Sequence, residues 1–329
     1  MRRVAGEEGL AEGAALLRAG GIVAFPTETV YGLGADARSD SAVQRIFAAK
    51  GRPSDNPLIV HVADREGARR LARRWPDLAE RLAARFWPGP LTLVVPARKE
   101  VASATRAGLD TVGLRCPAHP LALRLLQAAA LPVAAPSANR SGRPSPTTAE
   151  AVLDDLKAAD GLVLDGGPSG IGVESTVVDV SSGAPVLLRP GGLGREEVEA
   201  VAGPLLVLGD DGKAPRAPGM KYRHYAPALP VRLLRLEPEA AIAVIRRQFD
   251  PADTGILAAT EVREALSAYR GVDLGPDADS AAAALFEGLR RLERDPDLAR
   301  IVAVWCDTRG RGLAVLNRLE KAAGGGRHV

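Results

Sequence analysis

A group of polar side chains follows a short apolar run near the start of the chain. Residues 22–25 (Ile-Val-Ala-Phe) lie between two glycines and Pro26, a pattern typical of a short strand buried on both faces. Pro26 cannot donate to a sheet ladder, so we expect the strand to end there. The residues that follow supply hydroxyls, a carboxylate and a phenol: Thr27, Glu28, Thr29 and Tyr31. Because ligands bind beyond strand ends in open α/β sheets, this stretch predicts a ligand site.

A second cluster places two cations, Lys50 and Arg52, among glycine and prolines. Lys50 ends an expected helix, where the helix dipole alone favours a cation, whereas Arg52 lies beyond that helix and has no such explanation. Neither cluster contains the G-x-x-x-x-G-K-[ST] loop, and Gly32-Leu33-Gly34 lacks the third glycine of a dinucleotide fingerprint. The two cations therefore predict an anion site of another kind.

Other expected strands also carry polar side chains at or near their ends. Arg115 ends one apolar run, and Ser137 and Asn139 follow another. An arginine at a strand end either forms an ion pair at the rim or holds a carboxylate through two hydrogen bonds. His61 lies within a further apolar run, where it is either a hydrogen-bonded core residue or a pocket residue. The sequence leaves both alternatives open.

Residues 172–180 and 186–192 read as two strands joined by a turn, which predicts a hairpin. Ser175 lies early in the first strand and Arg189 near the end of the second. In an antiparallel pair, these two positions reach the same end of the sheet. Ser175 could instead be a strand hydroxyl on a solvent face.

Strands that alternate with helices must position these residues. Helical spacing or capping signals predict helices at 8–17, 41–50, 65–74, 76–86, 119–129 and 147–156. After residue 230, expected strands at 231–236, 256–259 and 301–305 alternate with expected helices at 239–249, 280–294 and 313–323. This second alternation is typical of a small Rossmann-like α/β domain.

Residues 204–230 are rich in Gly, Pro, Asp and Lys, which indicates a linker between two domains. The linker nevertheless contains Tyr222, His224 and Tyr225, which a passive tether does not need. We therefore expect it to fold over the mouth of the site as a lid. The predicted organisation is a catalytic domain at 1–203, a linker or lid at 204–230 and a Rossmann-like domain at 231–329.

The composition excludes several classes of protein. The chain has 329 residues, of which 46% are hydrophobic, and a net charge of +3, so no strong basic field indicates nucleic acid. Two cysteines are too few for a disulfide framework or a cysteine-rich zinc site. The N-terminus lacks an apolar signal region, and no run reaches about 18 apolar residues. We expect a soluble cytoplasmic protein with no membrane association.

Six motifs together resemble the YrdC-like threonylcarbamoyl-AMP synthases: residues 25–34 (FPTETVYGLG), 50–53 (KGRP), 56–58 (NPL), 87–90 (WPGP), 136–139 (PSAN) and 172–176 (GVEST). Residues 218–227 (PGMKYRHYAP) and the second domain resemble the long, two-domain form of this family. The resemblance implies a twisted, open, mixed α/β sheet with helices, followed by the linker and the smaller domain.

The resemblance also implies a reaction. L-threonine, bicarbonate or CO2, and ATP give threonylcarbamoyl-AMP and pyrophosphate, the first step in modifying the adenosine next to the anticodon of tRNAs. Magnesium is expected with ATP, although no acidic cluster indicates a built-in metal site. The product would pass to the machinery that transfers the threonylcarbamoyl group to tRNA.

The resemblance assigns roles residue by residue. Lys50 and Arg52 would be catalytic and act on the phosphates. The implied threonine-binding residues are Thr29, His61, Arg115, Ala135 and Ser175. The implied ATP-binding residues are Arg52, Asn56, Thr111, Ser137, Asn139, Ser145, Arg189 and Tyr222.

Two rival functions remain. One is a double-stranded RNA or tRNA binding module without synthase activity, and direct RNA contact is also possible for the enzyme; RNA binding would need exposed cations over a broad face. The other is the carbamoyltransferase of hydrogenase maturation, which carries a similar domain together with cysteine-rich zinc fingers. Two cysteines exclude such fingers here.

Overall fold

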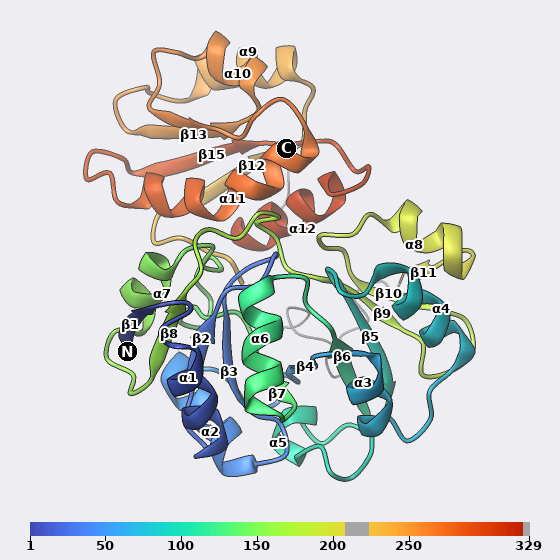
Figure 1. The fold of residues 1–329 in the computed structure, drawn as a ribbon. Helices are drawn as coiled ribbons and strands as arrows, with labels where there is room; N and C mark the ends of the chain where they lie inside the picture. The colour runs from blue at the N-terminus through green and yellow to red at the C-terminus, as the bar shows by residue number, and fades with distance from the viewer. Residues whose placement is uncertain (208–223, 325–329) are drawn as a thin grey trace.

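The computed structural model describes residues 1–207 and 224–324 and contains two α/β parts, one stacked on the other (Figure 1). The larger part is built on an 11-stranded sheet and the smaller on a 4-stranded sheet. The helices α11 (Ala278–Glu293) and α12 (Gly312–Ala322) of the smaller part lie on the side that faces the larger part (Figure 1). The described chain therefore has the mixed α/β architecture that the sequence predicted.

The strands of the large sheet lie in the order β1-β8-β2-β3-β7-β4-β6-β5-β9-β10-β11. Their bounds are β1 Arg2–Ala5, β2 Val23–Phe25, β3 Gly32–Asp36, β4 Ile59–His61, β5 Leu91–Pro96, β6 Thr111–Arg115, β7 Val133–Ala134, β8 Leu162–Asp165, β9 Thr176–Asp179, β10 Val186–Arg189 and β11 Leu206–Val207.

The large sheet is mixed, so the carboxyl ends of its strands do not all lie at the same edge. Strand β3 pairs antiparallel with both β2 and β7, so β2 and β7 run in the same direction. Strand β4 is antiparallel to β7 and parallel to β6. The carboxyl ends of β2 and β7 therefore point one way and those of β4 and β6 the other. The polar strand ends cannot share one edge of the sheet, and they meet across one of its faces.

Helices cover both faces of this sheet, with bounds α1 Leu10–Arg18, α2 Asp40–Lys50, α3 Arg65–Leu71, α4 Asp77–Phe86, α5 Ser103–Arg106, α6 Pro120–Ala129, α7 Ala149–Leu156 and α8 Arg195–Ala202. Along β2, Ala24 belongs to the main core with α2, α4 and α7, whereas Val23 and Phe25 pack with α1 and α6. This alternation follows from the two-residue repeat of a strand. A smaller apolar group includes Ile59 and Val94. It lies on the α1–α6 face, because Ile59 is two residues before His61, which pairs with Val133 of the α1–α6 cluster.

The smaller sheet is parallel, in the order β12-β15-β13-β14. Its elements are β12 Val231–Leu234, α9 Pro238–Gln248, β13 Thr254–Ala258, α10 Thr260–Ala265, β14 Gly271–Asp273, α11, β15 Arg300–Val304 and α12. Leu257 packs on the side of α11 and α12, whereas Ile256 and Ala258 pack on the side of α9 and α10. A parallel sheet with helices on both faces confirms the expected Rossmann-like arrangement.

Several elements differ from the sequence-based expectation. Strands β1, β3, β11 and β14 and helices α5, α8 and α10 were not expected, and the chain forms them nonetheless. Within the described ranges, no helix is both long and apolar enough to cross a bilayer.

Close backbone packing beside the end of β10 gives a first prediction. A Cβ atom at Gly191 would lie 2.3 Å from the carbonyl carbon of Ser175 and 2.4 Å from the carbonyl oxygen of Glu174. Backbone atoms cannot rotate away, so we expect Gly191→Ala to lower the free energy of unfolding by about 1–3 kcal/mol. Urea titration measures this change. At Gly170, a Cβ would meet no described atom within 4 Å, so Gly170→Ala is the matched control. Equal stability of the two variants would contradict the packing argument.

Candidate active site

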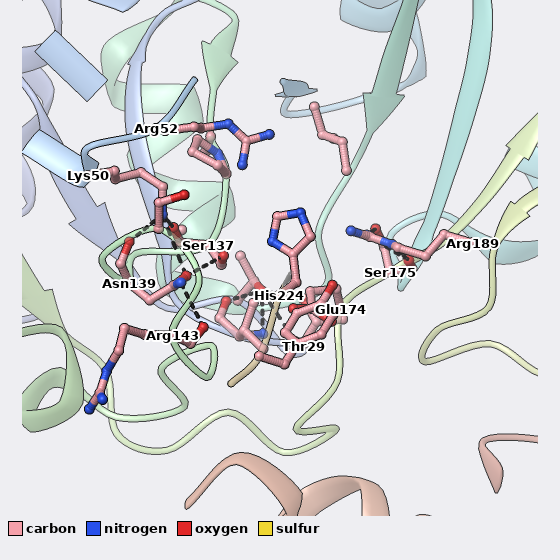
Figure 2. Close-up of a pocket in the computed structure, with 18 of the residues that line it drawn as sticks. Thr29, Lys50, Arg52, Ser137, Asn139, Arg143, Glu174, Ser175, Arg189 and His224 are labelled. Carbon is pink, nitrogen blue, oxygen red and sulfur yellow. Dashed lines mark hydrogen bonds between the residues drawn. The ribbon is translucent and has the colours of Figure 1, made fainter. Parts of the chain in front are cut away.

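A cleft lies on the α1–α6 face of the large sheet and encloses about 690 Å³, counted out to its open mouth. Ten of the residues singled out from the sequence line it: Thr29, Lys50, Arg52, His61, Arg115, Ala135, Ser137, Asn139, Ser175 and Arg189. Figure 2 shows Lys50, Ser137 and Asn139 on one side of this cleft and Ser175 and Arg189 on the other. The fold thus brings together side chains that are far apart in the sequence.

Lys50 is held inside the cleft wall at the end of α2. Its side chain is buried, and its ammonium group donates hydrogen bonds to the carbonyl oxygens of Ser137 and Asn139. Burial, together with the nearby Arg52 charge, lowers the Lys50 pKa well below its ordinary value. An anion bound in the cleft would stabilise the charged form of this lysine.

Arg52 lies just beyond the left-handed Gly51 that ends α2. Its guanidinium donates to the carbonyl oxygens of Asn56 and Pro57 at 3.3 and 3.4 Å, and its Nε has no hydrogen-bond partner among the described residues. Burial lowers the Arg52 pKa to about 10, which leaves the side chain charged at neutral pH. This arginine therefore keeps both a charge and donor capacity for a ligand.

Arg115, at the end of β6, forms a buried ion pair. Its Nη2 lies 2.6 Å from Glu28 Oε1, and its Nε donates to the carbonyl oxygen of Gly89 at 3.3 Å. The other oxygen of Glu28 accepts the backbone N–H of Ala118. The ion-pair alternative is therefore present in this structure. The guanidinium still lines the cleft, so the ion pair also fixes its orientation there.

The predicted hairpin is confirmed: β9 and β10 are antiparallel, with Arg189 opposite Val177. Ser175 directly precedes β9 rather than lying within it. Arg189 donates to the Ser175 carbonyl oxygen at 2.8 Å and to its hydroxyl at 3.1 Å, and that hydroxyl lies 2.8 Å from the Thr92 hydroxyl. These bonds fix the Ser175 hydroxyl at the cleft wall.

His61 is buried in β4, with its ring edge-on to Phe25 at a centroid distance of 5.9 Å. It lines the cleft, and its Nδ1 has no hydrogen-bond partner within residues 1–207 and 224–324. Burial, reinforced by the Arg115 charge, lowers the His61 pKa to about 3. The imidazole is therefore neutral at physiological pH.

The low His61 pKa predicts a pH dependence of stability. Between pH 6.5 and about 3, the unfolded chain binds a proton at this position that the folded chain does not, so stability falls as the pH falls. From pH 7 to pH 4.5, we expect wild type to lose about 2 kcal/mol more unfolding free energy than His61→Gln does. Urea titrations of both proteins at the two pH values measure this difference. Identical losses would show that His61 titrates normally.

Thr27 of the predicted ligand stretch and His224 and Tyr225 of the predicted lid also line the cleft. The sequence reasoning assigned no role to two further lining residues, Arg143 and Glu174. Glu174 is buried, and its Oε1 accepts the Ser145 hydroxyl at 2.5 Å. Burial would raise the Glu174 pKa, but Arg318 and Arg189 offset it and hold the pKa at about 2. Glu174 lies in the 172–176 motif, so its position was visible in the sequence, but its buried charge was not.

The remaining predicted residues lie near the cleft or outside the described chain. Ser145 reaches the cleft through Glu174. Thr111 lines a smaller hollow that shares Ile59 with the cleft. Asn56 is buried, and its Oδ1 has no hydrogen-bond partner in the described chain. Tyr222 and most of the predicted lid lie outside the described residues.

No group of three or more His, Cys, Asp or Glu side chains that could hold a metal ion occurs within the described ranges. The charged groups on the Lys50 side of the cleft are cations, which suit a polyanion. Any divalent cation in this cleft would have to gain ligands from the bound molecule and water.

Two family models match consecutive stretches of the chain. One, described as "Telomere recombination", matches residues 15–191. The other, described as "Threonylcarbamoyl-AMP synthase, C-terminal domain", matches residues 193–324.

Full-length relatives agree with these matches. A threonylcarbamoyl-AMP synthase of Bacillus subtilis is 48% identical, covering 96% of this chain and 93% of the relative. One from Pyrococcus abyssi is 46% identical, covering 94% of this chain and 93% of the relative. The crystal structure of P. abyssi Sua5 complexed with L-threonine superimposes with a TM-score of 0.90 at 44% identity, covering 98% of this chain and 96% of that one.

Proposed function

We propose a role for each wall of the cleft, because this chain belongs to the threonylcarbamoyl-AMP synthase family. The chain is a threonylcarbamoyl-AMP synthase: it converts L-threonine, bicarbonate or CO2, and ATP to threonylcarbamoyl-AMP and pyrophosphate. We propose, more specifically, that its reaction class is nucleotidyl transfer. The observation that carries the proposal is the pairing of buried cations with a hydroxyl-lined pocket in one cleft.

In the reaction, the threonine amine takes up CO2 and loses a proton to form a carbamate. A carbamate oxygen attacks the α-phosphorus of ATP, a new O–P bond forms, and the bond to the β-phosphate breaks to release pyrophosphate. The carbamate is a weak and unstable nucleophile. The protein's main tasks are therefore to align it with the α-phosphorus and to keep water away.

Lys50 and Arg52 would bind the phosphates and neutralise the charge that develops on the leaving pyrophosphate. The Lys50 pKa is low because burial takes its ammonium group out of water. A phosphate beside that group would stabilise its positive charge, so the low pKa supports this role. Ser137 and Asn139 hold the Lys50 ammonium through their carbonyl oxygens. We place the rest of ATP along Asn56, Thr111, Ser145 and Arg189, with Tyr222 as a further predicted contact. Magnesium would arrive with ATP as part of the substrate.

The opposite wall, which also carries the proposed ATP contact Arg189 (Figure 2), suits the amino acid. Arg115 would hold the threonine carboxylate, with its orientation set by Glu28. Thr29, His61 and Ser175 would surround the rest of threonine, and Ala135 would border it. Because His61 is neutral, it can both donate and accept a hydrogen bond without adding charge beside the carboxylate.

The threonylcarbamoyl-adenylate would pass in the cytoplasm to the enzymes that modify the adenosine beside the tRNA anticodon. Direct contact with RNA stays a prediction. The rival function of an RNA-binding module without synthase activity gains no support from the relatives above.

The direct test is a pyrophosphate assay on the full chain. We expect MgATP to release pyrophosphate only when threonine and bicarbonate are both present. Release with threonine but without bicarbonate would indicate an ordinary amino-acid adenylation. Release that does not depend on threonine would overturn the proposal.

A further inference from the structure

Two arginines of the smaller part are fully buried against the larger one. Arg318, on α12, is 0% exposed, and Arg290, on α11, is 1% exposed. Burying a guanidinium is costly unless it is paired and hydrogen-bonded. Their partners therefore show what holds the two parts together. Arg290 bonds Asp155 and the Pro144 carbonyl oxygen, whereas Arg318 reaches the wall of the active site.

Arg318 makes two hydrogen bonds to the larger part. Its Nε donates to Glu174 Oε2 at 2.9 Å, and its Nη1 donates to the Pro190 carbonyl oxygen at 2.8 Å. Its guanidinium also lies over the Tyr225 ring, 5.3 Å from the centroid. The fork-shaped group thus bridges two separate segments of the catalytic part.

The two segments are the neighbours of proposed site residues. Glu174 directly precedes Ser175, and Pro190 directly follows Arg189. Ser175 and Arg189 bond each other, and Ser145 donates to the same Glu174 carboxylate. One guanidinium from the smaller part therefore contacts the residues that flank this pair.

The loop before Glu174 is also packed between the two parts. A Cβ atom at Gly172 would lie 2.2 Å from the Ala282 carbonyl oxygen on α11, so the backbones are in close contact there. On its other side, the Gly172 N–H donates to the Thr29 carbonyl oxygen at 3.1 Å. A displacement of the smaller part would reach Thr29 and Ser175 through this loop.

We propose that Arg318 is a positioning residue for the synthase site: it fixes Glu174 and Pro190, and through them the Ser175–Arg189 wall. The smaller part thereby completes the active site rather than serving only as an attachment. This inference rests on the proposed function, because the wall matters only if the cleft binds ATP and threonine.

Loss of Arg318 would also change the charge of Glu174. The charged or titratable groups that face this carboxylate are Arg318, Arg189, His224 and Tyr225. Without Arg318, burial would raise the Glu174 pKa, so the carboxylate would take up a proton at higher pH than in wild type. Activity should then fall as the pH is lowered, which a purely structural defect would not cause.

The test uses the full chain with Arg318→Met, Arg318→Lys and Glu174→Gln, and the double variant Glu174→Gln/Arg318→Met. Arg235→Met is the matched control, because Arg235 forms an exposed ion pair with Glu320 of α12, the helix that carries Arg318. For Arg318→Met, we expect kcat/KM for ATP to fall about tenfold or more, with an added acid limb in its pH profile. Arg318→Lys keeps the positive charge, so its pH profile should lack the acid limb expected for Arg318→Met.

The double variant keeps the inference testable even if Arg318→Met is too unstable to assay, because it leaves no unpaired buried carboxylate. We expect its kcat/KM for ATP to be no lower than that of the less active single variant, since the two residues act as a unit. Two results would overturn the inference: Arg318→Met within about twofold of wild type, or losses that multiply in the double variant. Inactive wild-type protein would instead overturn the proposed function.

Discussion

Arg52→Ala should stop adenylate formation while threonine binding survives. Charge-assisted hydrogen bonds contribute about 1.5–3 kcal/mol each, so kcat/KM for ATP should fall at least about 10- to 100-fold. Arg52 is well placed for this effect because its Nε has no hydrogen-bond partner in the described chain. Steady-state kinetics with ATP as the varied substrate, and calorimetry with threonine, measure the two quantities.

Arg45→Ala is the control for Arg52→Ala, since Arg45 is an exposed arginine of α2, the helix that leads to Arg52. It should keep wild-type kinetics. A loss of threonine binding with intact ATP affinity in Arg52→Ala would reverse the assignment of the two walls.

Arg115→Gln should have the opposite pattern. Glutamine removes the charge that would hold the threonine carboxylate, so we expect KM for threonine to rise about 10- to 100-fold with little change in ATP affinity. Threonine titrations by calorimetry and kinetics check this result.

A second effect must be separated, because Arg115→Gln also leaves Glu28 without its ion-pair partner. Glu28→Gln removes the same ion pair and keeps the arginine charge. If Glu28→Gln weakened threonine binding as much as Arg115→Gln did, Arg115 would act only by holding the loop at Glu28.

Much of the framework follows from local patterns. Strand β8 begins and ends where the sequence predicts, and the β9–β10 hairpin was also predicted. These segments have strong apolar runs and clear turn residues, so local preference and tertiary structure agree. Strand β3 was missed because Gly32 and Gly34 disfavour a strand, and pairing with β2 and β7 overrides that preference.

The site was less predictable than the fold. The motifs identified the residue types at the cleft, but not that antiparallel pairing brings strand ends from both directions onto one face. The sequence also gave no sign of the contact between Arg318 and Glu174, which are 144 residues apart. An arginine in a helix usually indicates a solvated face, and only the packing of the two parts shows that this one is buried.

A double-label experiment tests whether the cleft joins a threonine carbamate to ATP. The full chain is incubated with threonine, 14C-labelled bicarbonate and ATP labelled with 32P at the α-phosphate. If the two walls of the cleft bring a threonine carbamate to the α-phosphorus, one product must carry both labels. Chromatography of the reaction mixture should show that doubly labelled compound only when threonine is present. Labels that stay on separate compounds, with threonine and ATP both bound, would contradict the account.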